Sequence, residues 1–348
     1  MGPRIGELDG HGEQVGAMMS TELDPGTAVP ARTSLDVMGR VIELSRPLDL
    51  RQTLGPMQRG ASDPSMRIRG DEVVRATRTP VGPASLWLSY SPVRGQVSAR
   101  AWGAGAGWAI DRLPDLLGEQ DDPAPLLGII ESSGLPERRL LRDLCRTMPG
   151  LRIPRSGQIF EALLPTIIEQ RVTGAEARRS YRDLVLALGE PAPGPSELFG
   201  RLMVPPSPTT LSATPYWDFH RLGIELKRAR TIVGAGRQAA RFDRLVDLAP
   251  VEARRVLLSL AGVGEWTAAE VALIALGDAD AVSVGDYHIP HQITWAFTGK
   301  PRGNDQTMLE LLEPYRGQRG RVIRLIQAAG ITAPRFGPRR EVSPFRNR

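Results

Sequence analysis

The sequence predicts a mainly α-helical protein with a small α/β region ahead of the helices. Three observations lead to this prediction. From about residue 126 apolar residues recur at helical spacing. Between 41 and 110, short segments rich in β-branched and aromatic residues are separated by Pro and Gly. A glycine turn at 260–264 joins two apolar-periodic segments, as expected for two helices linked by a tight hairpin.

The composition divides the chain into four regions. Residues 1–40 show little apolar periodicity, so we expect a disordered tail there. Residues 41–125 contain four strand-like segments followed by the helical WAIDRLPDLLG, which predicts a small α/β domain. Residues 126–330 are predicted to form a helical domain. Residues 331–348 read as a tail rich in Pro and Arg.

Within the helical region the boundaries follow from periodicity and capping residues. We expect helices at 158–169 and 175–188, then a proline-rich connector over 191–208, and a helix over 226–241 before the hairpin pair. The last helices are predicted at 305–312, with Asn304 as N-cap, and at 321–329.

Composition narrows the function classes. The 348 residues suffice for two domains with their own cores. They contain neither a signal-peptide core nor an apolar run near the ~20 residues of a membrane span. We therefore expect a cytoplasmic, nucleoid-associated protein without membrane contact. The single cysteine, Cys145, excludes a four-cysteine iron–sulfur cluster, a disulfide within the chain and a cysteine-based zinc site, and no cofactor is expected.

Charge favours a nucleic-acid partner. The net charge is +5, and residues 316–348 hold nine arginines against one acidic residue, Glu341. A basic end of this kind adds salt-dependent affinity for DNA. It equally fits a solubilising tail.

The glycine turn has a shape suited to a phosphate. Backbone N–H groups at Gly262, Val263 and Gly264 would stand before a helix N-terminus, where they form a concave positive site. Such a contact fixes register on DNA and reads no sequence. An ordinary αα-hairpin is the alternative.

A lone carboxylate, Asp286, follows Gly264 by 22 residues in the sequence VGDYH. One reaction that needs such a carboxylate is the cleavage of a base–sugar bond, because it builds positive charge on the sugar. A carboxylate about 4 Å away stabilises that charge by roughly 4 kcal/mol at an effective dielectric near 20, which is on the order of 10³ in rate. A helix cap or a solvated surface charge is the alternative for a loop aspartate.

These segments resemble the helix–hairpin–helix DNA glycosylase superfamily, and most closely its bacterial DNA-3-methyladenine glycosylase II (alkylbase glycosylase) branch. The stretch LAGVGEWTAAEVALIALGDADAVSVGDYH carries the resemblance. It is supported upstream by FEALLPTIIEQRVT, LKRAR and GLRIPRSG, in the family's order. The resemblance covers about 145–330, is faint over 41–125 and is absent from 1–40.

The resemblance implies a monofunctional DNA glycosylase. Asp286 would stabilise the sugar cation and activate water, and the phosphate-binding residues would be Gly262, Val263, Gly264 and Thr267. Relatives that also cut the backbone use a lysine at the position of Trp266. Because this chain has only two lysines, Lys227 and Lys300, and neither lies there, no Schiff base is expected.

The resemblance also places a duplex probe and a base pocket. Gln170 and Arg171 fall in the loop that probes the duplex, where relatives carry an apolar wedge; Arg171 would stack or meet a phosphate. The pocket positions are Trp266, Glu270, Tyr287 and Arg324, and a Glu270–Arg324 pair would make one wall polar. His288 and His291 are spaced by three residues, which suits a pair of metal ligands. We favour the alternative that these histidines are buried or face a phosphate.

The expected function is therefore base excision by a monomer acting on double-stranded DNA that carries a damaged base. Alkylated purines, above all 3-methyladenine, are the substrates that the resemblance implies. The competing hypothesis is a non-catalytic damaged-DNA-binding protein with the same fold, against which an intact Asp286 argues. A lyase-type enzyme is a weaker rival because of Trp266.

Overall fold

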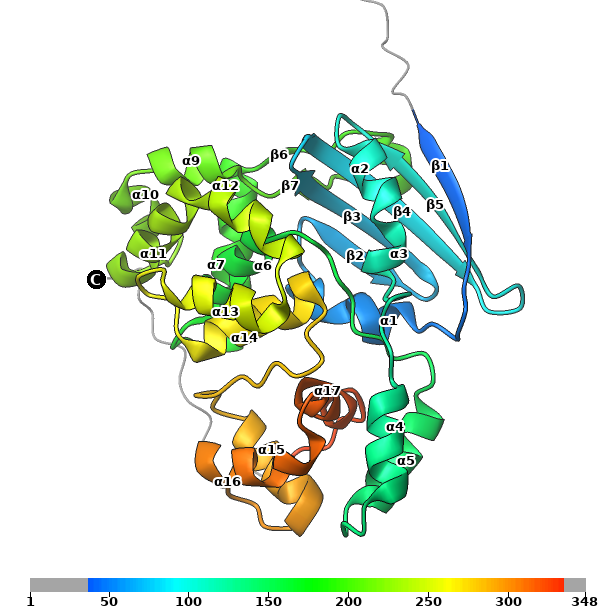
Figure 1. Ribbon diagram of the computed structural model, residues 1–348. Helices are drawn as coiled ribbons and strands as arrows, with labels where there is room; N and C mark the ends of the chain where they lie inside the picture. Colours follow the sequence, from blue (N-terminus) through cyan, green and yellow to red (C-terminus); the bar gives the residue numbers. More distant parts are fainter. Residues whose placement is uncertain (1–36, 335–348) are drawn as a thin grey trace, which may run out of the picture. The chain divides into compact units, whose positions relative to one another are not determined.

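The computed structural model describes residues 37–334 (Figure 1). The tails predicted at 1–40 and 331–348 lie mostly outside the described residues. The first strand begins at Met38, so the predicted N-terminal tail is shorter by at least its last three residues. Nothing in the described part is a helix long and apolar enough to cross a membrane.

An antiparallel sheet forms the N-terminal part (Figure 1). Its strands are β1 (Met38–Glu43), β2 (Met66–Arg69), β3 (Glu72–Thr79), β4 (Gly82–Ser91) and β5 (Gln96–Trp102), in the order β1-β5-β4-β3-β2. The short helices α2 (Ala106–Asp111) and α3 (Leu113–Leu116) supply Ile110, Leu113 and Leu116 to the core of one face. The predicted α/β character is confirmed.

Two short elements of this part were not predicted. β2 pairs with β3, and α1 (Leu50–Leu54), continued by a 3₁₀ turn at Gly55–Met57, begins at the last residue of the strand-like segment 41–50. Asp49 starts α1 by accepting the Gln52 N–H at 2.9 Å, a local cap that ends the extended run.

The first helical subdomain is built around one large apolar core. It comprises α6 (Ile159–Glu169), α7 (Gly174–Leu188), α9 (Pro208–Ala213), α10 (Tyr216–Arg221), α11 (Leu226–Arg237), α12 (Ala239–Phe242), the 3₁₀ turn Asp243–Asp247, α13 (Pro250–Leu258) and α14 (Glu265–Val271), which continues as a π-helical turn (Ala272–Leu276). Within the predicted proline-rich connector lie α8 (Ser196–Phe199) and the paired strands β6 (Glu190–Pro191) and β7 (Met203–Val204).

The second helical subdomain joins two distant stretches of chain around a separate core. It contains α4 (Ala124–Ser132), α5 (Arg138–Thr147), α15 (Ile289–Thr298), α16 (Asp305–Leu312), the 3₁₀ turn Glu313–Tyr315 and α17 (Arg319–Ala328). The chain thus leaves this subdomain after α5 and returns after the hairpin, so the linker that carries Asp286 connects the two helical subdomains.

Local signals set the helix boundaries well. Asn304 caps α16 by accepting the Thr307 N–H at 2.9 Å, as predicted. Thr173 and Glu176 form a reciprocal capping box that starts α7. The helix predicted over 226–241 is instead two helices that separate at Gln238.

Candidate active site around Asp286

The two hairpin glycines differ in what requires them. Gly262 has φ +89°, and an added Cβ would lie 2.0 Å from the Thr231 hydroxyl oxygen of α11. Gly264 has an extended backbone (φ −104°), and no heavy atom lies within 4 Å of where its Cβ would be. Packing therefore demands the first glycine, whereas the second faces open space at the start of α14.

The hairpin offers fewer N–H groups than the sequence predicted. The Val263 N–H donates to the Leu260 carbonyl at 3.0 Å, so it is used within the turn. The N–H groups of Gly262 and Gly264 have no partner among the described residues, and the first turn of α14 adds its own unpaired N–H groups. Thr267 is buried, and its hydroxyl accepts from Gln170 at 2.9 Å.

Asp286 is held by three N–H donors. The indole Nε1 of Trp266 donates to Oδ2 at 3.0 Å, and the backbone N–H groups of His288 and Ile289 donate to Oδ1 at 2.6 and 2.8 Å. The carboxylate therefore does cap α15, the alternative role weighed from sequence. It is also fastened to the first turn of α14, directly behind the hairpin. One hydrogen bond thus ties the loop carboxylate to the hairpin helix.

The loop that carries Asp286 is anchored at both ends. The Gly285 N–H donates to the Asp305 carboxylate at 3.1 Å, and the Asp286 N–H donates to the Ser283 carbonyl at 3.2 Å. These bonds place the carboxylate before any ligand arrives.

Glu270 lies one helical turn beyond Trp266, so both side chains share a face of α14. Its Oε1 accepts from the Ser283 hydroxyl at 2.5 Å. Burial raises the pKa of Glu270, and the nearby Glu169 and Asp286 raise it further, whereas the Ser283 hydrogen bond and Arg59 lower it.

The predicted direct Glu270–Arg324 pair does not form. Arg324 donates to the Gln52 carbonyl at 2.9 Å and to the Gln327 side chain at 3.3 Å. Burial lowers the pKa of Arg324, and the attraction of Glu270 opposes this. The two groups therefore interact through space, each bonded to a neutral partner, because α1 supplies a carbonyl that the sequence could not place there.

The loop of residues 170–173 between α6 and α7, which the sequence predicts to probe the duplex and which we call the probe loop, has an unusual backbone conformation. Arg171 has φ +58°, the only positive φ of a non-glycine residue in the described chain, a conformation that costs on the order of 1–3 kcal/mol. Its side chain is exposed and bonds to no described residue.

Gln170 points from the same loop toward the hairpin. Its amide Nε2 donates to the Gly262 carbonyl and to the Thr267 hydroxyl, both at 2.9 Å. The sequence grouped Gln170 with Arg171 as a probe. The structure shows the Gln170 amide holding the probe loop against the hairpin, while Arg171 is free.

Arg59 and Glu169 were not singled out from sequence. The Arg59 guanidinium, in the loop before β2, pairs with the Glu169 carboxylate at 3.1 Å, and Glu169 precedes Gln170. This contact brings the N-terminal sheet region to the probe loop. Arg59 and Glu169 are 110 residues apart in the sequence, so no sequence pattern connects them.

The aromatic and histidine side chains after Asp286 lie at the surface. Tyr287 is 79% exposed, with its ring edge-on to His288 and His291 at centroid distances of 4.9 and 6.0 Å. The His291 Nδ1 accepts the Gly303 N–H at 3.1 Å. In the described residues no three His, Cys, Asp or Glu side chains gather in a way that could hold a metal ion.

Three arginines of the basic C-terminal segment form ion pairs with other residues of the protein. Arg316 pairs with Glu313, Arg319 with Asp280, and Arg321 with Asp121. The arginines beyond residue 334 lie outside the described residues.

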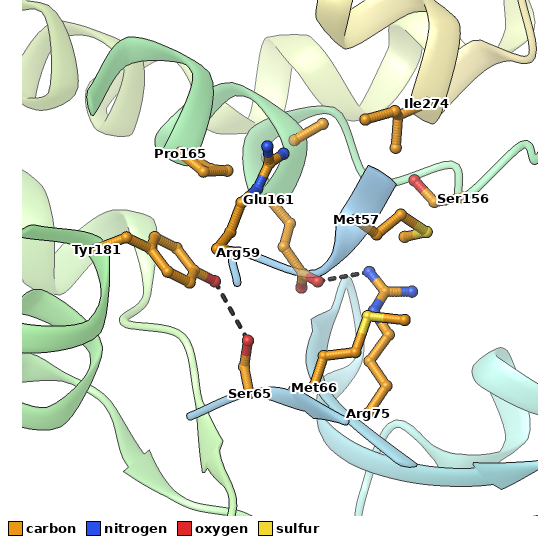
Figure 2. A pocket seen from close by; sticks show the side chains of 11 residues that line it. Met57, Arg59, Ser65, Met66, Arg75, Ser156, Glu161, Pro165, Tyr181 and Ile274 are labelled. Carbon is orange, nitrogen blue, oxygen red and sulfur yellow. Dashed lines mark hydrogen bonds and ion pairs between the residues drawn. The ribbon is translucent and has the colours of Figure 1, made fainter. Parts of the chain in front are cut away.

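Two hollows lie away from Asp286. A cavity of about 20 Å³, which has room for a water molecule, lies between the sheet and helices α6 and α7. In Figure 2 the Arg75–Glu161 ion pair (2.5 Å) and the Ser65–Tyr181 hydrogen bond (3.3 Å) border it. A hollow of about 300 Å³ lies near Phe160, Pro205 and Asp243. Neither is lined by the residues around Asp286.

Comparisons with known proteins place the fold. No family model matches the chain. A curated relative from Mycobacterium tuberculosis, described as a probable bifunctional transcriptional activator/DNA repair enzyme AlkA, is 32% identical over 149 residues, covering 42% of this chain. The chain spans 29% of the length of that relative.

Among solved structures, a 3-methyladenine DNA glycosylase from Archaeoglobus fulgidus superposes with a TM-score of 0.69 at 16% identity, covering 84% of this chain and 98% of the other. An 8-oxoguanine glycosylase/lyase from Clostridium acetobutylicum gives a TM-score of 0.63 at 12% identity, with 84% and 98% covered. The chain therefore has the fold of the helix–hairpin–helix DNA glycosylases, and the resemblance drawn from the sequence is confirmed for the fold.

Proposed function

We propose that this protein is a DNA N-glycosylase that flips a damaged base out of a duplex and hydrolyses its bond to the sugar with Asp286. The observation that carries the proposal is the 3.0 Å hydrogen bond from Trp266 to Asp286. It couples the catalytic carboxylate to the helix that follows the hairpin, so a phosphate seated at the turn and a sugar beside the carboxylate are in fixed register. Solved structures with this fold are named a 3-methyladenine DNA glycosylase and an 8-oxoguanine glycosylase/lyase.

The bonding of Asp286 suits this chemistry. A carboxylate has about four acceptor positions, and three N–H donors use three of them. One position remains to face the sugar cation or to accept a proton from the attacking water. Because the donors are fixed by α14 and α15, the carboxylate needs no reorganisation when charge develops on the sugar.

The hairpin and the probe loop supply the DNA contacts. The open space at Gly264 lets a phosphate approach the free N–H groups closely. Gln170 fixes the probe loop on the same hairpin, and Arg171, exposed and unbonded, enters the duplex to occupy the place of the flipped base.

The reaction ends at an abasic site. Trp266 occupies the place of the lysine that lyase relatives use, so the chain has no amine there to form a Schiff base. We propose a monomer acting on double-stranded DNA without a cofactor. The substrate class that the resemblance implies is an alkylated purine, with 3-methyladenine first.

The test compares wild type with Asp286→Asn in single-turnover assays on duplexes that carry one defined lesion each: 3-methyladenine, 1,N6-ethenoadenine or hypoxanthine. Base release is expected to fall by on the order of 10²–10⁴ in the variant, with strand breaks appearing only after alkali. Asn keeps the capping geometry, so the variant should fold. Asp305→Asn is the matched control, because it weakens only the anchor of the same loop.

Undiminished release by Asp286→Asn would overturn the assignment of Asp286. Tight binding without release from any lesion would favour the non-catalytic DNA-binding protein. Strand breaks without alkali would contradict the monofunctional mechanism.

A further inference from the structure

A second carboxyl group, Glu270, is tied to the same two elements as Asp286. Asp286 is bound to α14 through the Trp266 indole, and Glu270, one turn further along α14, is bound to the Asp286 loop through Ser283. The Ser283 carbonyl in turn accepts the Asp286 N–H at 3.2 Å. These reciprocal bonds place two carboxyl groups beside one another on one wall of the site.

The two carboxyl groups have opposite environments. Asp286 accepts three N–H bonds, two of them at the start of α15. Glu270 accepts one hydroxyl bond on Oε1, and its Oε2 has no hydrogen-bond partner among residues 37–334. Glu270 is half-buried.

Four charged groups from different elements act on Glu270. Glu169 at the end of α6 and Asp286 repel its anionic form. The two cations, Arg59 before β2 and Arg324 on α17, attract it, but each is bonded elsewhere, Arg59 to Glu169 and Arg324 to the Gln52 carbonyl. Burial is the largest influence and raises the pKa of Glu270, so its protonated form persists to higher pH than that of an ordinary glutamic acid.

A pair of carboxyl groups in such different surroundings is the arrangement that glycoside-cleaving enzymes use for an acid and an ionised partner. The acid matters only for some leaving groups. A cationic alkylpurine departs as a neutral base and needs no proton, whereas an uncharged purine would depart as an anion unless it is protonated as the bond breaks.

We propose that Glu270 is the general acid of this site, donating a proton from Oε2 to a ring nitrogen of the departing base, and that the preferred substrates are uncharged damaged purines. This inference rests on the proposed glycosylase function. It replaces the 3-methyladenine that the resemblance implies, because that base is a cationic N-methylpurine in DNA, with uncharged lesions such as 1,N6-ethenoadenine and hypoxanthine.

The proton and electron balance is complete. The Oε2 proton passes to the base while the C1′–N9 electron pair goes to N9, so the base leaves neutral and the sugar becomes a cation opposite Asp286. Water then bonds to C1′ and gives a proton to the Asp286 carboxylate. Proton exchange with solvent restores Glu270–H and ionised Asp286.

The experiment measures single-turnover base release from duplexes containing 1,N6-ethenoadenine, hypoxanthine or cationic 7-methylguanine, between pH 5 and 9. Enzymes are wild type, Glu270→Gln and Asp286→Asn. Asp243→Asn serves as the matched control, because burial also raises the pKa of that carboxyl, which lies in the hollow near Phe160.

Glu270→Gln is expected to slow release of the uncharged bases by on the order of 10²–10⁴, and release of 7-methylguanine by less than about tenfold. The wild-type rate on uncharged bases should decline as pH rises through the pKa of Glu270, and this decline should be absent in Glu270→Gln. Release of 7-methylguanine also shows that the variant is folded.

Equal slowing of both classes by Glu270→Gln, or an unchanged alkaline decline, would overturn the role of Glu270 while release that depends on Asp286 still supports the proposed function. Wild-type preference for 7-methylguanine would overturn the substrate class. If wild type releases no base from any of these duplexes, the proposed function itself is overturned.

Discussion

Two groups of acidic side chains show how differently the same residue types are used. At the junction between the sheet and the second helical subdomain, Asp121 pairs with Arg321 and Arg46, and Glu119 pairs with Arg152. At the candidate site, Asp286 and Glu270 form no ion pair with any residue that the structure describes and are bonded by N–H and O–H donors instead.

The difference separates structural charge from reactive charge. An arginine that is bidentate to a carboxylate uses up its acceptor positions and holds two chain segments together. Neutral donors orient a carboxylate without cancelling its charge. The ion pairs of Asp121 and Glu119 therefore stabilise the fold, whereas Asp286 and Glu270 keep the charge or proton that the proposed function requires.

The largest effect on stability is expected from Asp121→Asn. Arg321 and Asp121 are nearly inaccessible, and the substitution leaves a buried guanidinium without its counter-charge. The free energy of unfolding should fall by about 3–5 kcal/mol, measured by urea titration. Asp286→Asn should cost less, about 1–3 kcal/mol in the same assay, because Asn keeps the cap of α15 but turns an amide N–H toward the Trp266 indole N–H and loses that one hydrogen bond. Equal losses would erase the contrast between the two groups.

The hairpin glycines provide the next contrast. Gly262→Ala must place a Cβ against Thr231 at a positive φ, so we expect a loss of about 2–4 kcal/mol in unfolding free energy. Gly264→Ala meets no atom and should change stability by under about 1 kcal/mol, yet weaken binding to duplex DNA in a fluorescence titration. A large stability loss at Gly264 would show that its open space is not reserved for a ligand.

A smaller effect is expected where the probe loop meets the hairpin. Gln170→Ala removes two hydrogen bonds, to Gly262 and Thr267, and should lower the free energy of unfolding by about 1–3 kcal/mol. Hydrogen exchange of residues 170–173 should accelerate with it. If exchange there is unchanged, Gln170 is not what holds the loop.

The pH dependence of stability should have opposite signs in the two groups. The pKa of Glu270 is raised, chiefly by burial, so its contribution to stability is present at low pH and is lost as pH rises through its folded-state pKa. The Arg152 and Ser45 hydrogen bonds outweigh burial and lower the pKa of Glu119, so its contribution is present near neutrality and is lost as pH falls through its folded-state pKa.

Thermal melts between pH 3 and 9 check these signs. Glu270→Gln should gain Tm relative to wild type as pH rises, whereas Glu119→Gln should lose Tm at neutral pH and approach wild type as pH falls. The reverse order in either variant would contradict the assigned surroundings.

Features encoded in short stretches of sequence were predicted well. The hairpin, the Asn304 cap and the four longest strands depend on neighbours within a few residues. β2 and α1 were missed because β2 is only four residues long and α1 only five, too short to show a period. The internal use of the Val263 N–H was missed because it depends on how tightly the turn closes.

The sequence by itself determined the mainly helical class, the glycine turn, and a carboxylate at a set distance along the chain from it. Only the tertiary structure decided that Trp266 holds Asp286, that Ser283 binds Glu270, and that Arg324 is drawn to Gln52 rather than paired with Glu270. Periodicity and caps act over a few residues, so a sequence displays them. A side chain chooses its partner among groups brought together by packing from far along the chain, and that choice exists only once the cores have formed.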